Sequence, residues 1–231
     1  MATVNTPTWG IVKGMRRTAT TSNAILGLLA LRPRWSTWEL ATQLGRNMRF
    51  FWPRAESRIY DEARALDRKG LAAATRTLHG RRPRTTYAIT ARGRRQLKRW
   101  LETPPRATAL ECEPVLRVLL ADLGTREQLL TAIGQVRRDG ERVLEVGRVV
   151  GAEYLAGTAP FQDDVHARAL VFDFLSHHAL AFIRWADRAE ATVRAWETMS
   201  LDERDAAAIE TVRACLEEYP AAPDGAASAP G

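Results

Sequence analysis

One segment of the sequence combines arginine, serine and tyrosine at helical spacing. An apolar stripe with steps of four, four and three predicts a helix over residues 53–70, made of Ala55, Ile59, Ala63 and Leu66. The polar side chains of this helix that can contact a nucleic acid are Arg54, Ser57, Arg58, Tyr60 and Arg64. A guanidinium can bridge O6 and N7 of guanine, which is worth about 1–3 kcal/mol of base discrimination. We therefore expect base contacts from Arg54, Ser57 and Arg64, whereas Tyr60 can equally hydrogen-bond a phosphate or pack its ring in the core.

A second basic cluster occupies a six-residue turn, 79–84 (HGRRPR), between two strand-like segments, 71–78 and 85–90. A basic turn of this kind can approach the minor groove or its phosphates. The residues expected there are Gly80, which permits a tight turn, and Arg81, Arg82 and Arg84. A basic N-terminal arm, residues 1–20, adds Lys13, Arg16 and Arg17 as phosphate contacts.

The elements that must position these residues follow from the flanking sequence. A short helix is expected over 23–31, capped by Thr21 or Ser22. A second helix, 36–45, opens with Ser36 and Glu39 in capping-box spacing and is expected to end at Gly45. Another helix starts from Thr90 and closes at Pro104 and Pro105. Three helices followed by a basic hairpin are typical of a winged helix-turn-helix.

The C-terminal half contains no convincing strand and two long apolar stripes. Their steps alternate between three and four, the seam spacing of helices that pack nearly parallel or antiparallel. The predicted dimerisation residues are Leu129, Ile133, Val136, Val143, Phe172, Leu175, Phe182, Val193 and Trp196. The sequence thus predicts a mainly α fold, in which a winged helix-turn-helix with an α/β wing (21–105) precedes a long-helix dimerisation and effector domain (106–219) and a disordered tail (220–231).

Charge separates along the chain in the same way. Residues 1–105 contain 21 Lys and Arg against 6 Asp and Glu, whereas residues 106–231 contain 13 against 21. A difference of this size in net charge between the two halves is informative about binding partners rather than about fold. The N-terminal half is expected to bind a polyanion, and double-stranded DNA is favoured over an anionic membrane because no basic helix with a broad aromatic face is visible.

Several other classes of protein are disfavoured. No apolar run approaches the roughly 18 residues of a membrane span, and no secretory signal is visible, so we expect a cytoplasmic protein. Cys112 and Cys215 lie far apart, which argues against a disulfide framework or a zinc site. No phosphate-binding loop, GxSxG or HExxH motif occurs, so we expect neither an enzyme nor a cofactor. Adjacent histidines at 177–178 point about 100° apart on a helix, which disfavours a shared metal.

Several blocks in order resemble the PadR-like transcriptional regulators. They are Ala24–Leu29 (AILGLL), Trp52-Pro53 leading into Ser57–Tyr60 (SRIY), Leu66–Leu71 (LDRKGL), and Arg84–Thr90 (RTTYAIT) followed by Gly93. Leu116–Leu130 resembles the longer helical C-terminal domain of the same family. The segment 32–38 (RPRWSTW) departs from the compact turn that family members often have there.

The resemblance implies a homodimeric repressor whose third helices enter adjacent major grooves. Release by a small-molecule effector is a further expectation, and aromatic residues of the C-terminal half can line its pocket or simply form core. The alternative is a non-regulatory scaffold that binds another nucleic acid or an acidic protein.

Overall fold

The structure, a computed structural model, describes residues 15–53, 56–79 and 82–220. The chain forms two compact units, the first ending at Ala109 and the second beginning at Leu110. The predicted boundary at Pro105 falls in the extended segment after the last helix of the first unit. Among the described residues, none of the helices is both long and apolar enough to cross a bilayer.

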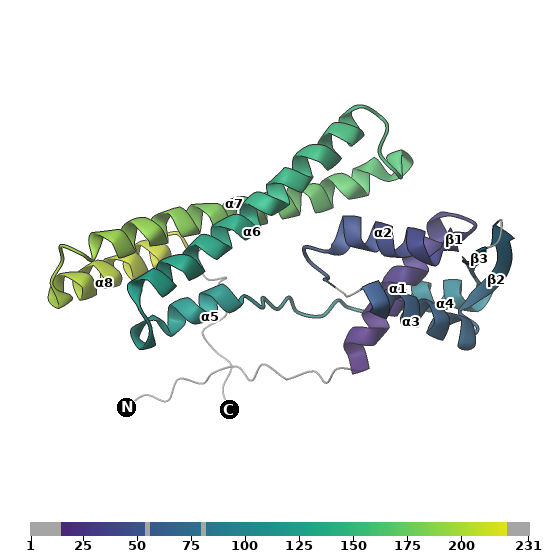
Figure 1. Ribbon diagram of the computed structural model, residues 1–231, viewed down its shortest axis with the longest axis horizontal. Coiled ribbons are helices and arrows are strands. Elements are labelled where there is room, and N and C mark those ends of the chain that lie inside the picture. The colour runs from purple at the N-terminus through teal and green to yellow at the C-terminus, as the bar shows by residue number, and fades with distance from the viewer. Residues whose placement is uncertain (1–14, 54–55, 80–81, 221–231) are drawn as a thin grey trace. The chain divides into compact units, whose positions relative to one another are not determined.

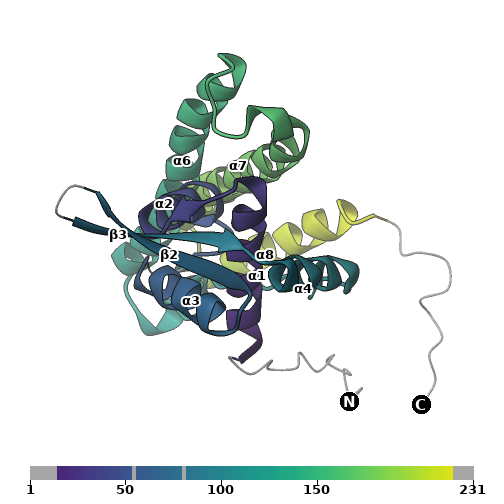
Figure 2. The same cartoon turned by 90° about the vertical axis from the view of Figure 1, so that its right-hand side faces the viewer.

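The N-terminal unit is a winged helix, as the sequence predicts (Figures 1 and 2). Its elements follow in the order α1 (Met15–Leu31), β1 (Trp35–Ser36), α2 (Thr37–Met48), α3 (Glu56–Arg68), β2 (Ala72–His79), β3 (Arg82–Ile89) and α4 (Ala91–Glu102). The three described strands are antiparallel in the order β1-β3-β2. Ala72 pairs with Ile89 at one end of the β2–β3 hairpin and His79 with Arg82 at the other, and the hairpin extends beyond the helices (Figure 2).

The second helix begins as predicted but ends later. The Ser36 hydroxyl accepts a hydrogen bond from the Glu39 amide at 3.2 Å, and the Glu39 carboxylate accepts one from the Ser36 amide at 2.7 Å. This capping box is confirmed. The predicted stop at Gly45 is wrong, because α2 continues to Met48, whose carbonyl accepts the amides of residues 51 and 52. An exposed glycine costs a helix only about 0.5–1 kcal/mol, so tertiary packing prevails over it.

The first helix starts at Met15, well before the predicted start near residue 23. Thr21 and Ser22, expected as caps, are buried inside the helix instead. Thr21 accepts a hydrogen bond from the indole of Trp52 at 3.2 Å, and Ser22 donates one to Glu62 of α3. These tertiary partners satisfy hydroxyls that would otherwise favour a helix end.

A compact corner joins α3, β2 and α4. Gly70 has a φ of +67°, and the bonds Gly70 N–H to Asp67 O (2.9 Å) and Leu71 N–H to Leu66 O (2.9 Å) form a Schellman motif. Thr90 caps α4, accepting from the amide of Gly93 at 3.0 Å and donating to the carbonyl of Gly70 at 2.8 Å. The turn after α3 and the start of α4 are therefore tied to each other.

All of the secondary structure described in the C-terminal unit is helical. It contains α5 (Glu113–Leu119), η1 (Ala121–Leu123), α6 (Arg126–Leu155), η2 (Gln162–Asp164), α7 (Val165–Ala195) and α8 (Leu201–Glu217). The long helices α6 and α7 lie side by side as a hairpin (Figure 1). Leu129 and Ile133 of α6 pack on Ala186 and Val193 of α7. An ideal Cβ at Gly140 would lie 2.7 Å from the carbonyl oxygen of Ala179, so α6 and α7 approach closely there.

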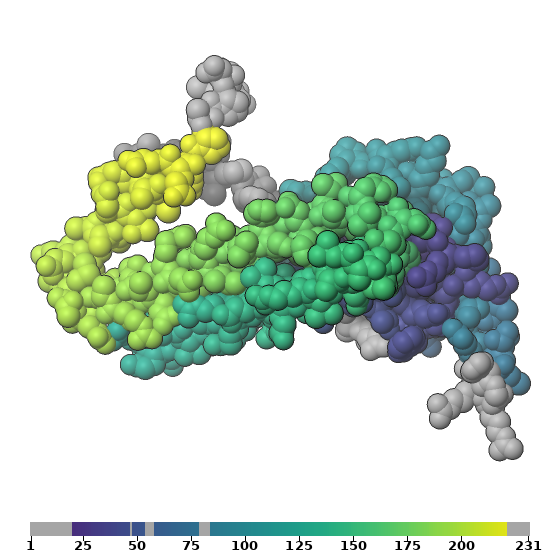
Figure 3. All heavy atoms as spheres, turned by 90° about the horizontal axis from the view of Figure 1, so that it is seen from above, coloured from purple at the N-terminus to yellow at the C-terminus, as the bar shows by residue number. Residues whose placement is uncertain are grey.

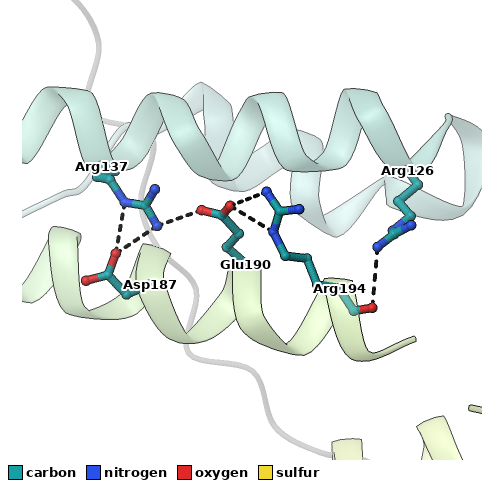
Figure 4. A network of polar contacts seen from close by, with 5 residues as sticks. All are labelled: Arg126, Arg137, Asp187, Glu190 and Arg194. Carbon is teal, nitrogen blue, oxygen red and sulfur yellow. Dashed lines mark hydrogen bonds and ion pairs between the residues drawn. The ribbon is translucent and has the colours of Figure 1, made fainter. Parts of the chain in front are cut away.

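Ion pairs fix the register of this hairpin (Figure 4). Arg137 of α6 contacts both Asp187 and Glu190 of α7 at 2.7 Å, and Arg194 contacts the second oxygen of Glu190 at 2.7 Å. Arg126 of α6 donates to the carbonyl of Arg194 at 3.4 Å. Hydrogen bonds from Arg194 and Arg137 lower the pKa of Glu190 below its usual value. The two helices therefore cannot slide without separating several charges.

Candidate nucleic-acid interface

Helix α3 buries one face and presents the other to solvent. Ile59, Ala63 and Leu66 are buried, which confirms the predicted inward stripe over the described part of the helix. Arg58 and Arg64 are exposed on the remaining surface. The buried carboxylate of Glu62 accepts the hydrogen bond from Ser22, which attaches α3 to α1. Arg58 and Arg64 therefore lie on a helix whose opposite face is fixed in the core of the N-terminal unit.

The charge on this face is partly balanced within the helix. Arg64 pairs with Asp61 at 3.0 Å, and their side chains are 61% and 74% exposed. An exposed pair of this kind contributes about 0–1 kcal/mol, so a stronger anionic partner can displace it. Tyr60 is half-buried, so its position rules out neither of its two predicted roles.

The wing brings two arginines to one face of the sheet. Arg84 of β3 is exposed and pairs with Glu39 of α2 at 3.3 Å. Arg34 donates to the hydroxyl of Thr75 at 2.9 Å. Thr75 and Arg84 lie on the same face, because Thr75 pairs with Thr86, two residues from Arg84. Arg34 is a candidate that the sequence did not reveal, since only the strand pairing brings its partner beside Arg84.

Glu39 is the acidic member of this group. Hydrogen bonds from the hydroxyl and amide of Ser36 lower the pKa of Glu39, with a smaller contribution from Arg84. Glu39 is therefore ionised and keeps Arg84 in place near the start of α2. Because that pair is largely exposed, Arg84 can exchange its partner for a phosphate at little cost.

The remaining predicted contacts divide into two groups. Arg16 and Arg17 lie near the start of α1, Ser57 in the first turn of α3, and Arg82 at the first position of β3. The predicted residues that fall outside the described part of the chain are Lys13, Arg54, Gly80 and Arg81.

The predicted dimerisation residues also divide into two groups. The structure buries Leu129, Ile133, Val136 and Val193 within the C-terminal unit of a single chain. The residues that keep some exposure are Val143, Phe172, Leu175, Phe182 and Trp196. Alternating steps of three and four describe a seam equally well within one chain or between two chains.

Comparison with known proteins agrees with this geometry. Residues 25–99 match the model of the "Transcriptional regulator PadR-like family". A probable transcriptional regulator of Mycobacterium tuberculosis, Rv1176c, is 33% identical over 93 residues, which span 40% of this chain and 47% of that protein. The chain thus matches about half the length of this curated relative.

Two solved structures share the fold. A crystal structure of Bacillus subtilis PadR in complex with operator DNA matches with a TM-score of 0.63 at 19% identity, over 75% of this chain and 99% of that one. A structure of the same protein with p-coumaric acid matches with a TM-score of 0.58 at 19% identity, over 79% and 99% of the two chains. The match to the PadR-like family model thus falls within the winged-helix unit, and the fold is that of solved PadR structures.

Proposed function

We propose that this chain is a homodimeric repressor that binds a pseudo-palindromic operator with α3 in the major groove and the β2–β3 wing at the minor groove. The observation that carries the proposal is the exposure of Arg58 and Arg64 opposite the buried stripe of α3. The fold shared with a PadR protein bound to operator DNA supports it. The excess of 21 basic over 6 acidic residues in 1–105 supplies attraction to phosphates.

Specificity and affinity come from different parts of this surface. Arg58 and Arg64, on a rigid helix, are suited to guanine edges, where a bidentate contact discriminates by about 1–3 kcal/mol. Arg34 and Arg84, on the wing side, are suited to phosphates, which position the protein without reading sequence. The pairs Arg64–Asp61 and Arg84–Glu39 hold these side chains extended until DNA replaces the carboxylates.

The C-terminal unit is the dimerisation unit in this proposal. Of the 24 exposed large apolar side chains in the described residues, 18 lie between Leu110 and Tyr219, so the C-terminal unit carries most of the apolar surface that a second copy could cover. Half-sites one DNA turn apart are separated by about 34 Å. The 30 residues of α6 extend for about 45 Å, which is long enough to bridge that distance.

Regulation by a small ligand completes the proposal. The structure of Bacillus subtilis PadR with p-coumaric acid supports an aromatic acid as one class of effector to be tested. A ligand can release DNA only by binding the DNA-free conformation more tightly than the DNA-bound one. An effector therefore raises the operator dissociation constant in proportion to that difference.

Fluorescence anisotropy with duplex DNA from the promoter of the protein's own gene tests the proposal. If each protomer neutralises about four phosphates, the log–log salt dependence of binding has a slope near −7. Single-stranded RNA of the same sequence is expected to bind much more weakly, since α3 is shaped for a B-form major groove. Absence of duplex binding in dilute buffer, or equal binding to the RNA, would refute the proposal.

A further inference from the structure

Helix α4 presents a continuous cationic face to solvent. Its 12 residues include four arginines and one lysine against a single carboxylate, that of Glu102 at the last position. At about 100° per residue, the five cations fall within about 160° of the helix circumference, opposite the side that carries the buried Gly93. All five are exposed: Arg92, Arg94, Arg95, Lys98 and Arg99. We refer to these five residues as the α4 cationic face.

The chain itself neutralises very little of this face. Lys98 lies 4.0 Å from Glu102, and both side chains are exposed. In the part of the chain that the structure describes, the four guanidinium groups of α4 have neither an ion pair nor a hydrogen-bond partner. Another helix pairs an exposed arginine with a carboxylate four residues away, as Arg117 does with Glu113 at 2.6 Å. The α4 cationic face is therefore available to an external anion.

The positions of these charges are unfavourable for the helix itself. Arg92 and Arg94 lie near the start of α4, where the helix dipole favours acidic side chains, and the first turn contains none. Arg95 and Arg99 are four residues apart, and like charges at this spacing repel each other. Stability therefore does not explain the arrangement. A bound polyanion would reverse both effects, because it would interact favourably with the dipole and screen the repulsion.

The α4 cationic face lies apart from the proposed operator-binding surface. Helix α4 packs on α1. Figure 2 shows α4 on the opposite side of α1 from α2 and α3. In the space-filling view, the blue-green atoms of this part of the chain form an outer edge of the N-terminal unit (Figure 3). A duplex held by α3 and the wing therefore leaves the α4 cationic face free.

We propose that the α4 cationic face binds the sugar–phosphate backbone of a second segment of double-stranded DNA, so that one protein molecule holds two duplex segments. This inference rests on the proposed function and adds a second DNA surface to it. Phosphate contacts position a protein without reading bases, so the second segment is expected to have any sequence.

The composition of the face favours DNA over other anionic partners. The centre of a protein–protein interface is depleted of charged residues and enriched in aromatic ones, whereas the centre of this face is made of arginines. A helix that binds a membrane surface needs a broad apolar side. The exposed large apolar residues of α4 are Trp100 and Leu101, and both lie at its C-terminal end.

The salt dependence of this contact follows from the number of unpaired cations. If the four arginines neutralise about four phosphates, the log–log slope is near −3.6, taking about −0.9 per phosphate. The affinity for the second segment is then expected to fall about a hundredfold between about 50 and about 200 mM salt. Arg92 to Arg99 extend for about 10 Å along the helix, a length of duplex that carries about six phosphates on its two strands.

A capture assay with the full chain tests the inference. Duplex DNA from the promoter of the protein's own gene is fixed to beads and saturated with protein at about 50 mM salt, and a labelled duplex of unrelated sequence is then added. The wild type is expected to retain the labelled duplex. Arg95→Glu combined with Arg99→Glu is expected to bind the fixed duplex within about threefold of the wild type but to retain the labelled one about tenfold more weakly, with a slope near −1.8. Arg184→Glu combined with Arg188→Glu makes the same charge change at the same spacing on exposed positions of α7 and is expected to behave like the wild type.

The outcomes separate this inference from the proposed function. A wild type that binds the fixed duplex but retains no labelled one overturns the inference alone, whereas a wild type that binds neither duplex overturns both. Retention by the α4 variant would place the second site elsewhere, and equal loss of both duplexes by this variant, with an unchanged thermal midpoint, would make α4 part of the first site. Loss of retention in the α7 control would attribute capture to net charge. Vesicles of phosphatidylglycerol that displace the labelled duplex at equal phosphate concentration would assign the face to lipid, and each of these results overturns the inference.

Discussion

Replacing Gly93 by Ala places a methyl group where the N-terminal unit has no space for it. An ideal Cβ at this position would lie 2.1 Å from the carbonyl oxygen of Leu71 and 3.0 Å from Cγ1 of Ile89. The first of these atoms belongs to the backbone and accepts hydrogen bonds from the Thr90 amide at 3.2 Å and the Thr90 hydroxyl at 3.1 Å. Helix α4 must therefore move away from the start of β2, which strains or lengthens these bonds.

The expected loss of stability follows from three contributions. Overpacking a fitted site costs about 1–3 kcal/mol. Weakening one hydrogen bond costs about 1 kcal/mol. Alanine returns about 0.5–1 kcal/mol through helix propensity. The net destabilisation by Gly93→Ala is therefore about 1–3.5 kcal/mol, equivalent to a fall in Tm of about 4–28 °C for a unit of this size.

Gly27→Ala is the matched control, since Gly27 also lies in a helix but has no atom within 4 Å of its ideal Cβ. This substitution is expected to stabilise the unit by about 0.5–1 kcal/mol. The two units of the chain can unfold separately, so hydrogen exchange of amides in α3 and β3 is the suitable measurement. The reasoning fails if Gly93→Ala protects these amides as well as Gly27→Ala does.

Three further outcomes are expected. Gly140→Ala would place a Cβ 2.7 Å from the carbonyl oxygen of Ala179, so it should loosen the α6–α7 hairpin by about 1–3 kcal/mol, seen as a lower urea midpoint. Arg64→Ala should weaken operator binding by about 1–3 kcal/mol in anisotropy titrations, whereas Arg142→Ala, which removes a comparable i,i+3 pair from α6, should leave it unchanged. Ser36→Ala removes the main cause of the lowered pKa of Glu39, so that pKa should rise towards its usual value in an NMR titration. Because the pKa of Glu39 is lowered in the folded state, its contribution to stability exists above the unfolded pKa and disappears as pH falls through the folded one, so the variant should lose less stability than the wild type below about pH 4.3.

Local chemistry explains which parts of the fold the sequence predicts. The stripe Ile59, Ala63 and Leu66 and the capping box at Ser36 depend on residues within one or two turns, and both occur as predicted. The start of α1 depends instead on Trp52 and Glu62, which satisfy Thr21 and Ser22 from distant parts of the chain. Strand β1, only two residues long, exists through its pairing with β3 and has no periodicity of its own.

The candidate site shows the same division. Arg58 and Arg64 were predicted on a helix and Arg84 in a basic turn, and all three are exposed. The predicted turn 79–84 is too long, because β2 extends to His79 and β3 begins at Arg82, so Arg84 lies within a strand. Arg34 was not predicted, because its position beside the wing depends on a hydrogen bond to Thr75, 41 residues away in the sequence. The apolar residues of α6 were predicted correctly as a seam, but periodicity cannot distinguish a partner helix in the same chain from one in another chain.

The hydrogen bond between Ser22 and Glu62 limits how the proposed recognition helix can be controlled. Rolling α3 about its own axis would pull the Glu62 carboxylate out of its buried position and bring Leu66, which is fully buried, into water. Such a movement would leave the buried Ser22 hydroxyl without its acceptor and also expose an apolar side chain, which together cost several kcal/mol. In the proposed repressor, an inducer would therefore displace the winged helix as a rigid body, and regulation would act through the spacing between half-sites rather than through the base sequence within each.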